Sequence, residues 1–149
     1  MKLTNKDYLF VTLQMILFVI YIFDILPKFK VPAYLSSAGV FVAVSGVVIS
    51  VVAMLKLDQN LTAFPTPKAN SELVSSGLYK FIRHPIYTGV ILFVLGYAVF
   101  KMSIFKMIIA VLLLILFWFK SKYEEKRLQE KYSRYSEYQQ KTGRFFPKF

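Results

Sequence analysis

The chain of 149 residues contains no cysteine, a single histidine and only eight acidic residues against 19 basic ones. Without cysteine it can form no disulfide framework, no thiol nucleophile and no cysteine-based metal site. Its six glycines are scattered along the chain. The glycine-rich turn between a strand and a helix, with which soluble dinucleotide-binding enzymes hold their cofactor, is therefore missing. Any cofactor site must be built from helix ends and loops.

What the chain has in abundance is apolar sequence, because 56% of its residues are hydrophobic and 17% are aromatic. These residues gather in four blocks, at residues 8–26, 33–57, 86–100 and 104–119. A helix needs about 20 residues to cross a bilayer. We therefore expect an all-α integral membrane protein with about four transmembrane helices. The first block reads as a retained helix rather than a signal peptide, and the two shorter blocks as a helical hairpin around residues 101–103.

The net charge of +11 is distributed unevenly about these expected helices. With four helices, both termini and the middle loop lie on one side with fifteen of the 19 basic residues, and the other side has Lys28, Lys30, Lys101 and Lys106. Because an excess of Lys and Arg marks the cytoplasmic face, we expect both termini in the cytoplasm. Anionic lipid headgroups are a sufficient partner for such a tail, and we expect no nucleic acid partner.

We expect a single membrane domain over residues 1–149. Residues 1–57 supply two membrane helices, and residues 58–149 the middle loop, the hairpin and an amphipathic C-terminal helix. A stripe of small residues follows one face of the second block, at Gly39, Ala43, Gly46 and Ser50. Such stripes allow membrane helices to approach closely, and Gly89 and Gly96 of the third block are a plausible counterpart.

The C-terminal helix is indicated by apolar and aromatic residues at helical spacing, namely Leu128, Tyr132, Tyr135 and Tyr138. Its aromatic stripe either lies on the membrane surface or covers a pocket between the other helices. At about 100° per residue, Glu124 points the same way as Leu128, whereas Glu125 is turned toward the flank.

The middle loop contains the only histidine, directly before a proline that favours the first position of a helix. His84 is therefore expected to precede a helix that begins at Pro85. The unpaired N–H groups of such a helix start attract anions, and Arg83 adds a planar charged group suited to carboxylate or phosphate. Tyr79 and Tyr87 flank this point. These residues indicate an anion site, unless they are ordinary membrane-interface residues.

Residues 77–89, with the sequence GLYKFIRHPIYTG, resemble the G-x-Y-x-x-x-R-H-P-x-Y-x-G signature of the isoprenylcysteine carboxyl methyltransferase and phospholipid methyltransferase superfamily. The approach to this run is similar to that of small bacterial members, through Phe64-Pro65-x-Pro67 and Leu73-Val74. The resemblance continues in the C-terminal segment with Glu124-Glu125-x-x-Leu128, Tyr135-x-x-Tyr138 and Arg144-Phe145-Phe146-Pro147. It covers roughly residues 57–149.

The resemblance implies a prokaryotic inner-membrane enzyme that uses S-adenosylmethionine at the cytoplasmic face, with no metal. Carried over by residue, it implies a cofactor site of Tyr79, Arg83, His84, Pro85, Tyr87, Gly89, Glu124 and Glu125. Of these, Arg83 and Glu124 are the candidate catalytic residues, and Arg144 is a candidate for contact with the acceptor. The acceptor would be lipophilic: a carboxylate such as that of an isoprenylcysteine, or a lipid amine or thiol.

Two other interpretations remain open at this point. Membrane sterol reductases share a distantly similar core and bind NADPH, although their arginine-proline segment is typically followed by Asn-Tyr rather than by the Ile86-Tyr87 found here. A non-enzymatic membrane module could also use the basic tail to bind lipids. Eukaryotic prenylcysteine enzymes are larger, so the acceptor pocket of this chain is expected to be smaller or partly open to lipid.

Overall fold

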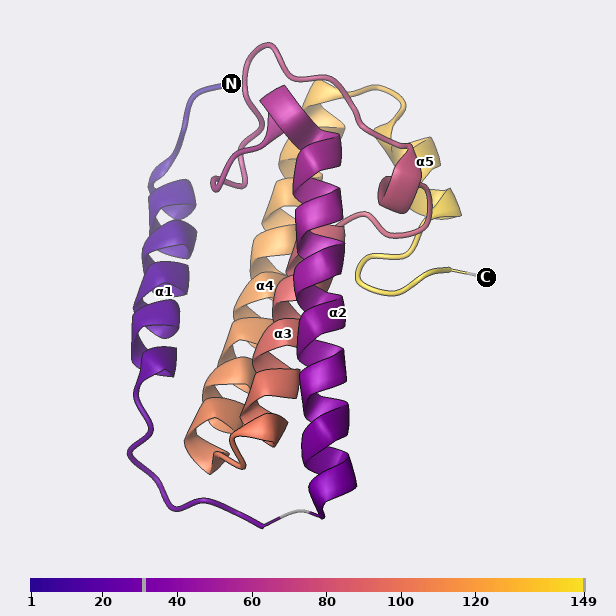
Figure 1. Ribbon diagram of the computed structural model, residues 1–149. Coiled ribbons are helices and arrows are strands. Elements are labelled where there is room, and N and C mark those ends of the chain that lie inside the picture. The colour runs from indigo at the N-terminus through magenta and orange to yellow at the C-terminus, as the bar shows by residue number, and fades with distance from the viewer. Residues whose placement is uncertain (31, 149) are drawn as a thin grey trace.

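The computed structural model describes residues 1–30 and 32–148, which form five α-helices and no strand (Figure 1). The helices are α1 (Asn5–Ile22), α2 (Ala33–Leu57), α3 (Pro85–Phe100), α4 (Ile104–Lys131) and α5 (Tyr135–Lys141). Two short 3-10 helices, η1 (Asp58–Asn60) and η2 (Gly77–Lys80), lie in the loop between α2 and α3. The expected all-α fold is confirmed.

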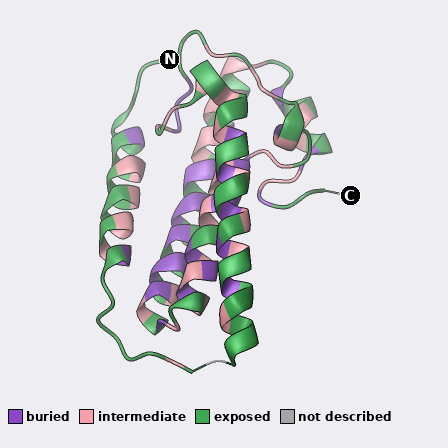
Figure 2. Cartoon of the chain, in the orientation of Figure 1, coloured by how far each residue is buried: buried purple, intermediate pink, exposed green. Residues whose placement is uncertain are grey.

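Three of these helices are long and apolar enough to cross a membrane: α1, α2 together with η1, and α4. The fourth, α3, has 16 residues and is about 24 Å long at 1.5 Å per residue. Buried residues concentrate along α3 and α4, whereas the outer faces of α1 and α2 are exposed (Figure 2). Large apolar side chains on that outer surface, such as Phe41 and Leu55, both 74% exposed, suit a lipid environment. The chain is an integral membrane protein.

The predicted packing of small residues is confirmed where α2 crosses α3. A Cβ atom added at Gly39 would lie 2.7 Å from the carbonyl oxygen of Gly96, and one at Gly89 would lie 2.8 Å from the backbone nitrogen of Ser50. Because real Cβ atoms do not approach other heavy atoms so closely, only glycine permits this separation of the two backbones. The contact fixes α3 against α2 and so fixes the start of α3, where the RHP sequence lies.

The predicted hairpin between α3 and α4 is also found. Ser103 precedes α4, and its hydroxyl accepts a hydrogen bond from the Lys106 backbone N–H at 3.1 Å. The N-terminus, the α2–α3 loop and α5 lie together at one end of the bundle, at the top of Figure 1. The α1–α2 and α3–α4 connections lie at the other end, so helices α1 to α4 alternate in direction (Figure 1).

The expected C-terminal helix is divided into two parts. Its first part, with Glu124 and Leu128, continues α4 without interruption to Lys131, and only Tyr135–Lys141 forms the separate helix α5. Tyr132, at the end of α4, has an extended backbone and interrupts the helical spacing. The chain turns there, and α5 folds back toward the start of α3.

Candidate functional site

The RHP segment is joined to the C-terminal segment by backbone hydrogen bonds. The N–H of Arg83 donates to the Gly143 carbonyl at 2.8 Å, and that of His84 donates to the Arg144 carbonyl at 3.1 Å. His84 immediately precedes α3, and Pro85 is the first helical residue, as the sequence predicted. This short parallel pairing brings Arg144 beside the start of α3, although the two are about 60 positions apart in the sequence.

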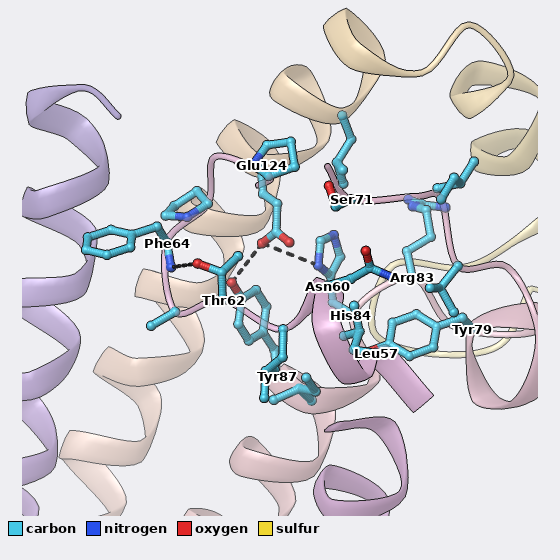
Figure 3. Close-up of a pocket in the computed structure, with 18 of the residues that line it drawn as sticks. Leu57, Asn60, Thr62, Phe64, Ser71, Tyr79, Arg83, His84, Tyr87 and Glu124 are labelled. Atoms are coloured by element: carbon cyan, nitrogen blue, oxygen red, sulfur yellow. Dashed lines mark hydrogen bonds and ion pairs between the residues drawn. The ribbon is translucent and has the colours of Figure 1, made fainter. Parts of the chain in front are cut away.

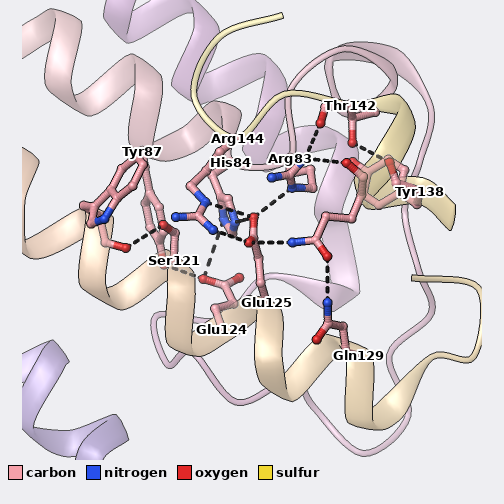
Figure 4. Close-up of polar contacts among 12 residues, drawn as sticks. Arg83, His84, Tyr87, Ser121, Glu124, Glu125, Gln129, Tyr138, Thr142 and Arg144 are labelled. Carbon is pink, nitrogen blue, oxygen red and sulfur yellow. Dashed lines mark hydrogen bonds and ion pairs between the residues drawn. The ribbon is translucent and has the colours of Figure 1, made fainter. Parts of the chain in front are cut away.

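Glu125 is the centre of a buried polar cluster between these segments (Figure 4). Its carboxylate accepts hydrogen bonds from Arg83 Nε at 2.7 Å, Arg144 Nη2 at 2.6 Å and Gln139 Nε2 at 3.0 Å. His84 Nε2 lies 3.2 Å from the same carboxylate, and Glu125 is only 3% exposed. These contacts join the start of α3, the C-terminal part of α4, and α5 with the segment that follows it.

The expectation that Glu125 turns toward the flank was wrong. It assumed one continuous helix whose inward face was set by Leu128 and Tyr135. Because the helix ends before Tyr135, α5 and the segment after it cover the side of α4 that carries Glu125. That side is therefore interior.

Arg83 is occupied by the protein itself. Besides its ion pair with Glu125, its Nη1 donates to the backbone carbonyls of Gln139, at 3.0 Å, and Thr142. Arg83 thus forms hydrogen bonds with two backbone carbonyls of the C-terminal segment. Its geometry is that of a residue that holds two segments together.

Glu124 lies one position earlier in α4 and faces a different environment (Figure 3). Its Oε2 accepts a hydrogen bond from the Tyr87 hydroxyl at 2.7 Å and lies 3.8 Å from His84 Nδ1. The rings of His84 and Tyr87 are stacked with their centroids 5.4 Å apart, which holds both near Glu124. The Glu124 side chain is 25% exposed, so one of its oxygens can reach a ligand.

A cavity of about 350 Å³ adjoins Glu124. Its walls come from α1 to α4, from α5 and from residues 60–74 of the α2–α3 loop. Five of the expected site residues line it, namely Tyr79, Arg83, His84, Tyr87 and Glu124. The predicted aromatic stripe also lines it, with Leu128, Tyr132, Tyr135 and Tyr138. Of the two positions proposed for that stripe, the one over a pocket is the one found.

The other expected site residues do not line the cavity but pack behind the residues that do. Pro85 starts α3 and is fully buried, and Gly89 permits the contact with α2. Glu125 and Arg144 belong to the buried cluster, with Arg144 also placed 4.8 Å from the Trp118 ring. Their positions support the wall rather than form its surface.

Two tyrosines at the edge of the cavity are joined by a hydrogen bond. The Tyr138 hydroxyl donates to the Tyr79 carbonyl at 2.6 Å. Burial raises the pKa of Tyr138 to about 12, and burial together with the negative charge of Glu124 raises the pKa of Tyr79. Both hydroxyls therefore stay protonated and can donate hydrogen bonds at any physiological pH.

Sequence reasoning missed Lys120 and Gln14, which also line the cavity. Lys120 was grouped with the basic tail, but it is only 1% exposed. Its Nζ donates to Gln14 Oε1 at 2.6 Å and to the Ala63 carbonyl at 2.9 Å, and it lies 5.4 Å from the centroid of the Tyr87 ring. The available signal was the four-residue spacing from Lys120 to Glu124, which places both on one helical face.

The loop over the cavity is tied to the end of α4 and to the start of α1. Lys131 Nζ donates to the Ala69 carbonyl at 3.0 Å, and the Tyr132 hydroxyl donates to the Ser71 carbonyl at 2.7 Å. At the other side, the buried carboxylate of Asp7 accepts from the Thr66 N–H at 2.8 Å. The cavity is thus covered by a loop with several fixed points.

Comparison with known proteins finds a protein family and a solved structure of the same fold. The model of the phospholipid methyltransferase family matches residues 35–135, which contain both the RHP segment and Glu124 and Glu125. The solved structure of the eukaryotic intramembrane Ras methyltransferase ICMT (isoprenylcysteine carboxyl methyltransferase), without a monobody, has the same fold, with a TM-score of 0.71 and 22% sequence identity. That match covers 98% of this chain and 54% of the enzyme, so the chain spans about half of its length. No curated protein sequence matches the chain significantly.

Proposed function

We propose that this chain, which belongs to the phospholipid methyltransferase family, transfers a methyl group from S-adenosylmethionine to a lipophilic acceptor at the membrane surface. The observation that carries the proposal is the cavity between the RHP segment and Glu124, at the polar end of an apolar helical bundle. A site at that position opens toward the aqueous phase, where the methyl donor is, and adjoins the bilayer, where a lipophilic acceptor is.

The residues present fit the donor. The cavity of about 350 Å³ lies within the range of roughly 300–1,000 Å³ that is usual for small-molecule sites. Tyr79 and Tyr135 offer aromatic surface for the adenine ring and for the positively charged sulfonium. The partly exposed carboxylate of Glu124 suits the donor's ammonium group. When bound, S-adenosylmethionine would supply an electrophilic methyl group on a positively charged sulfur atom.

The chain itself would mainly position the donor and the acceptor and exclude water from the site. A methyl sulfonium is already reactive, so alignment of the acceptor and removal of solvent account for most of the required acceleration. The Glu125 cluster holds Arg83, His84 and the start of α3 in a single geometry. The loop of residues 60–74 would shield the cavity from water. A carboxylate acceptor needs no general base, and we assign no proton transfer to His84.

The acceptor is proposed as a class: a lipid-attached carboxylate such as that of an isoprenylcysteine, or a lipid amine or thiol. The structural neighbour is a Ras methyltransferase, which favours a lipid-modified substrate. We further propose that the acceptor enters sideways from the bilayer. The polar end of the bundle, with both termini and most of the basic residues, would face the cytoplasm and contact anionic headgroups.

Calorimetry on the detergent-purified protein tests the donor. We expect S-adenosylmethionine to bind and NADPH not to bind. Glu124→Gln removes the charge at the cavity and should weaken donor binding about tenfold or more, in line with the loss of a charge-assisted hydrogen bond. Glu130→Gln, on the exposed surface of the same helix, is the matched control. Binding of NADPH in place of the donor by folded protein would overturn the proposal in favour of a reductase.

A further inference from the structure

Lys120 is a buried cation that lines the cavity and is not part of the Glu125 cluster. Its hydrogen-bond acceptors are the Gln14 side-chain amide and the Ala63 carbonyl, both of which are neutral. An ammonium group has three N–H donors, so one donor is left over by these two bonds. Among residues 1–30 and 32–148, no carboxylate forms an ion pair with it.

The two arginines of the site already share one carboxylate of the protein. Arg83 and Arg144 both bond to Glu125, at 2.7 and 2.6 Å, and Arg83 also bonds two backbone carbonyls. A ligand anion that displaced Glu125 from them would separate a buried carboxylate from both guanidinium groups and leave it only Gln139 and His84, which is unfavourable. A buried lysine with neutral partners, in contrast, gains from an anion placed beside it.

Lys120 and Glu124 lie one helical turn apart and face the same cavity. Four residues correspond to about 6 Å along a helix, so the two side chains present opposite charges at neighbouring positions. Tyr87 connects them, because its ring lies 5.4 Å from Lys120 Nζ and its hydroxyl donates to Glu124 at 2.7 Å. A cation beside an anion at this spacing is complementary to the carboxylate and ammonium groups of an α-amino acid.

We propose that Lys120 binds the α-carboxylate of the methyl donor, while Glu124 binds its α-ammonium group. This inference rests on the proposed function and assigns the carboxylate to Lys120 in place of Arg83, which sequence reasoning had favoured. Arg83 then holds the cavity wall without contact to the amino-acid end of the donor. Gln14 orients the Lys120 ammonium from α1, so the first membrane helix also contributes to the donor site.

The test compares two ligands that differ in the amino-acid group, whose carboxylate Lys120 is proposed to bind. S-adenosylhomocysteine carries the amino-acid group, whereas 5′-methylthioadenosine has the same adenosine and thioether without it. We expect Lys120→Met to weaken S-adenosylhomocysteine binding about 10- to 100-fold, as for a lost charge-assisted hydrogen bond, and to leave the affinity for 5′-methylthioadenosine within about twofold of its original value. Calorimetry in detergent measures both affinities.

Two further variants separate charge from shape. Lys122→Met, at an exposed position of the same helix, should change neither affinity. Lys120→Arg keeps the positive charge and should retain most of the preference for S-adenosylhomocysteine over 5′-methylthioadenosine. Retained binding of 5′-methylthioadenosine also shows that a variant still forms the cavity.

Each other outcome overturns the inference in a recognisable way. If Lys120→Met leaves both affinities unchanged, Lys120 does not contact the donor. If both affinities fall together, Lys120 supports the shape of the cavity and does not bind the carboxylate. If only the KM of the lipophilic acceptor rises, Lys120 serves the acceptor instead. Failure of the unaltered, folded protein to bind either nucleoside contradicts the proposed function itself.

Discussion

Two buried lysines of α4 lie near opposite ends of the bundle, and their surroundings differ. Lys106 is 4% exposed and Lys120 is 1% exposed. Lys106 Nζ donates to three backbone carbonyls at the end of α1, those of Tyr21 at 2.6 Å, Ile22 at 3.3 Å and Phe23 at 3.0 Å. These carbonyls have no partner within the helix, so Lys106 caps α1 and uses all three of its donors.

Lys120 is as deeply buried but has only two such bonds, and it borders a cavity. An ionisable residue within a membrane helix is a functional candidate by default. The comparison shows that burial alone does not distinguish the two roles. What distinguishes them is unused bonding capacity together with space for a ligand, and only the end with Lys120 has both among the described residues.

The largest loss of stability is expected at the end of the bundle with the cavity, where a single carboxylate, Glu125, joins three segments. Glu125→Ala removes the partner of Arg83 and Arg144 and leaves buried positive charge, which costs about 3–5 kcal/mol when a buried ion pair is broken. Thermal unfolding in detergent, followed by circular dichroism, should show a large fall in melting temperature. Glu130→Ala is the exposed control on the same helix. An unchanged melting temperature for Glu125→Ala would show that the cluster does not hold the segments together.

An intermediate effect is expected at the opposite end. Lys106→Met leaves three carbonyls of α1 without a donor and should lower stability by about 1–3 kcal/mol, the cost of unsatisfied buried groups. Its affinity for S-adenosylhomocysteine should not change, because Lys106 is remote from the cavity. Melting temperature and affinity are measured on the same preparation. Loss of affinity without loss of stability would erase the distinction between the two lysines.

The smallest effect is expected for Tyr87, which lies between the two charged residues of the proposed donor site, Lys120 and Glu124. Tyr87→Phe removes the hydroxyl that donates to Glu124 while it keeps the ring beside Lys120. The affinity for S-adenosylhomocysteine should fall about threefold to tenfold, as for one hydrogen bond, with little change in melting temperature. Tyr123→Phe, whose hydroxyl contacts Thr4 instead, should have no effect on affinity. Equal losses from both variants would mean that the Tyr87 hydroxyl has no special part.

Local sequence signals predicted the fold well. Pro85 after His84 marked the start of α3 because proline restricts the backbone of its neighbours. The stripe with Gly39 and Gly46 marked the face on which α3 packs because small residues let two helices approach closely. The four apolar blocks predicted the membrane helices because the length of an apolar run indicates whether a helix can cross the bilayer. The family resemblance of residues 77–89 agrees with the match to the phospholipid methyltransferase family. The roles of the individual site residues remain predictions.

The sequence could not give the arrangement of the C-terminal segment. Helical spacing continued past Tyr132, but contacts with the loop at Ser71 and with the RHP segment divide the helix there. Glu125 was placed on the wrong side for this reason. Lys120 was missed because its partners, Gln14 and Ala63, are distant in the sequence. Such tertiary contacts leave no local pattern.

If this cavity serves methyl transfer to a lipophilic acceptor, the methyl group of the donor must reach a lipid. The most direct measurement incubates the protein, in membranes of its own source cell, with S-adenosylmethionine that carries a labelled methyl group, and follows the label into an organic extract. We predict label in the extract that depends on the protein and is lost with Glu124→Gln but not with Glu130→Gln. A folded protein that binds the donor yet transfers no label to the extract would contradict the account.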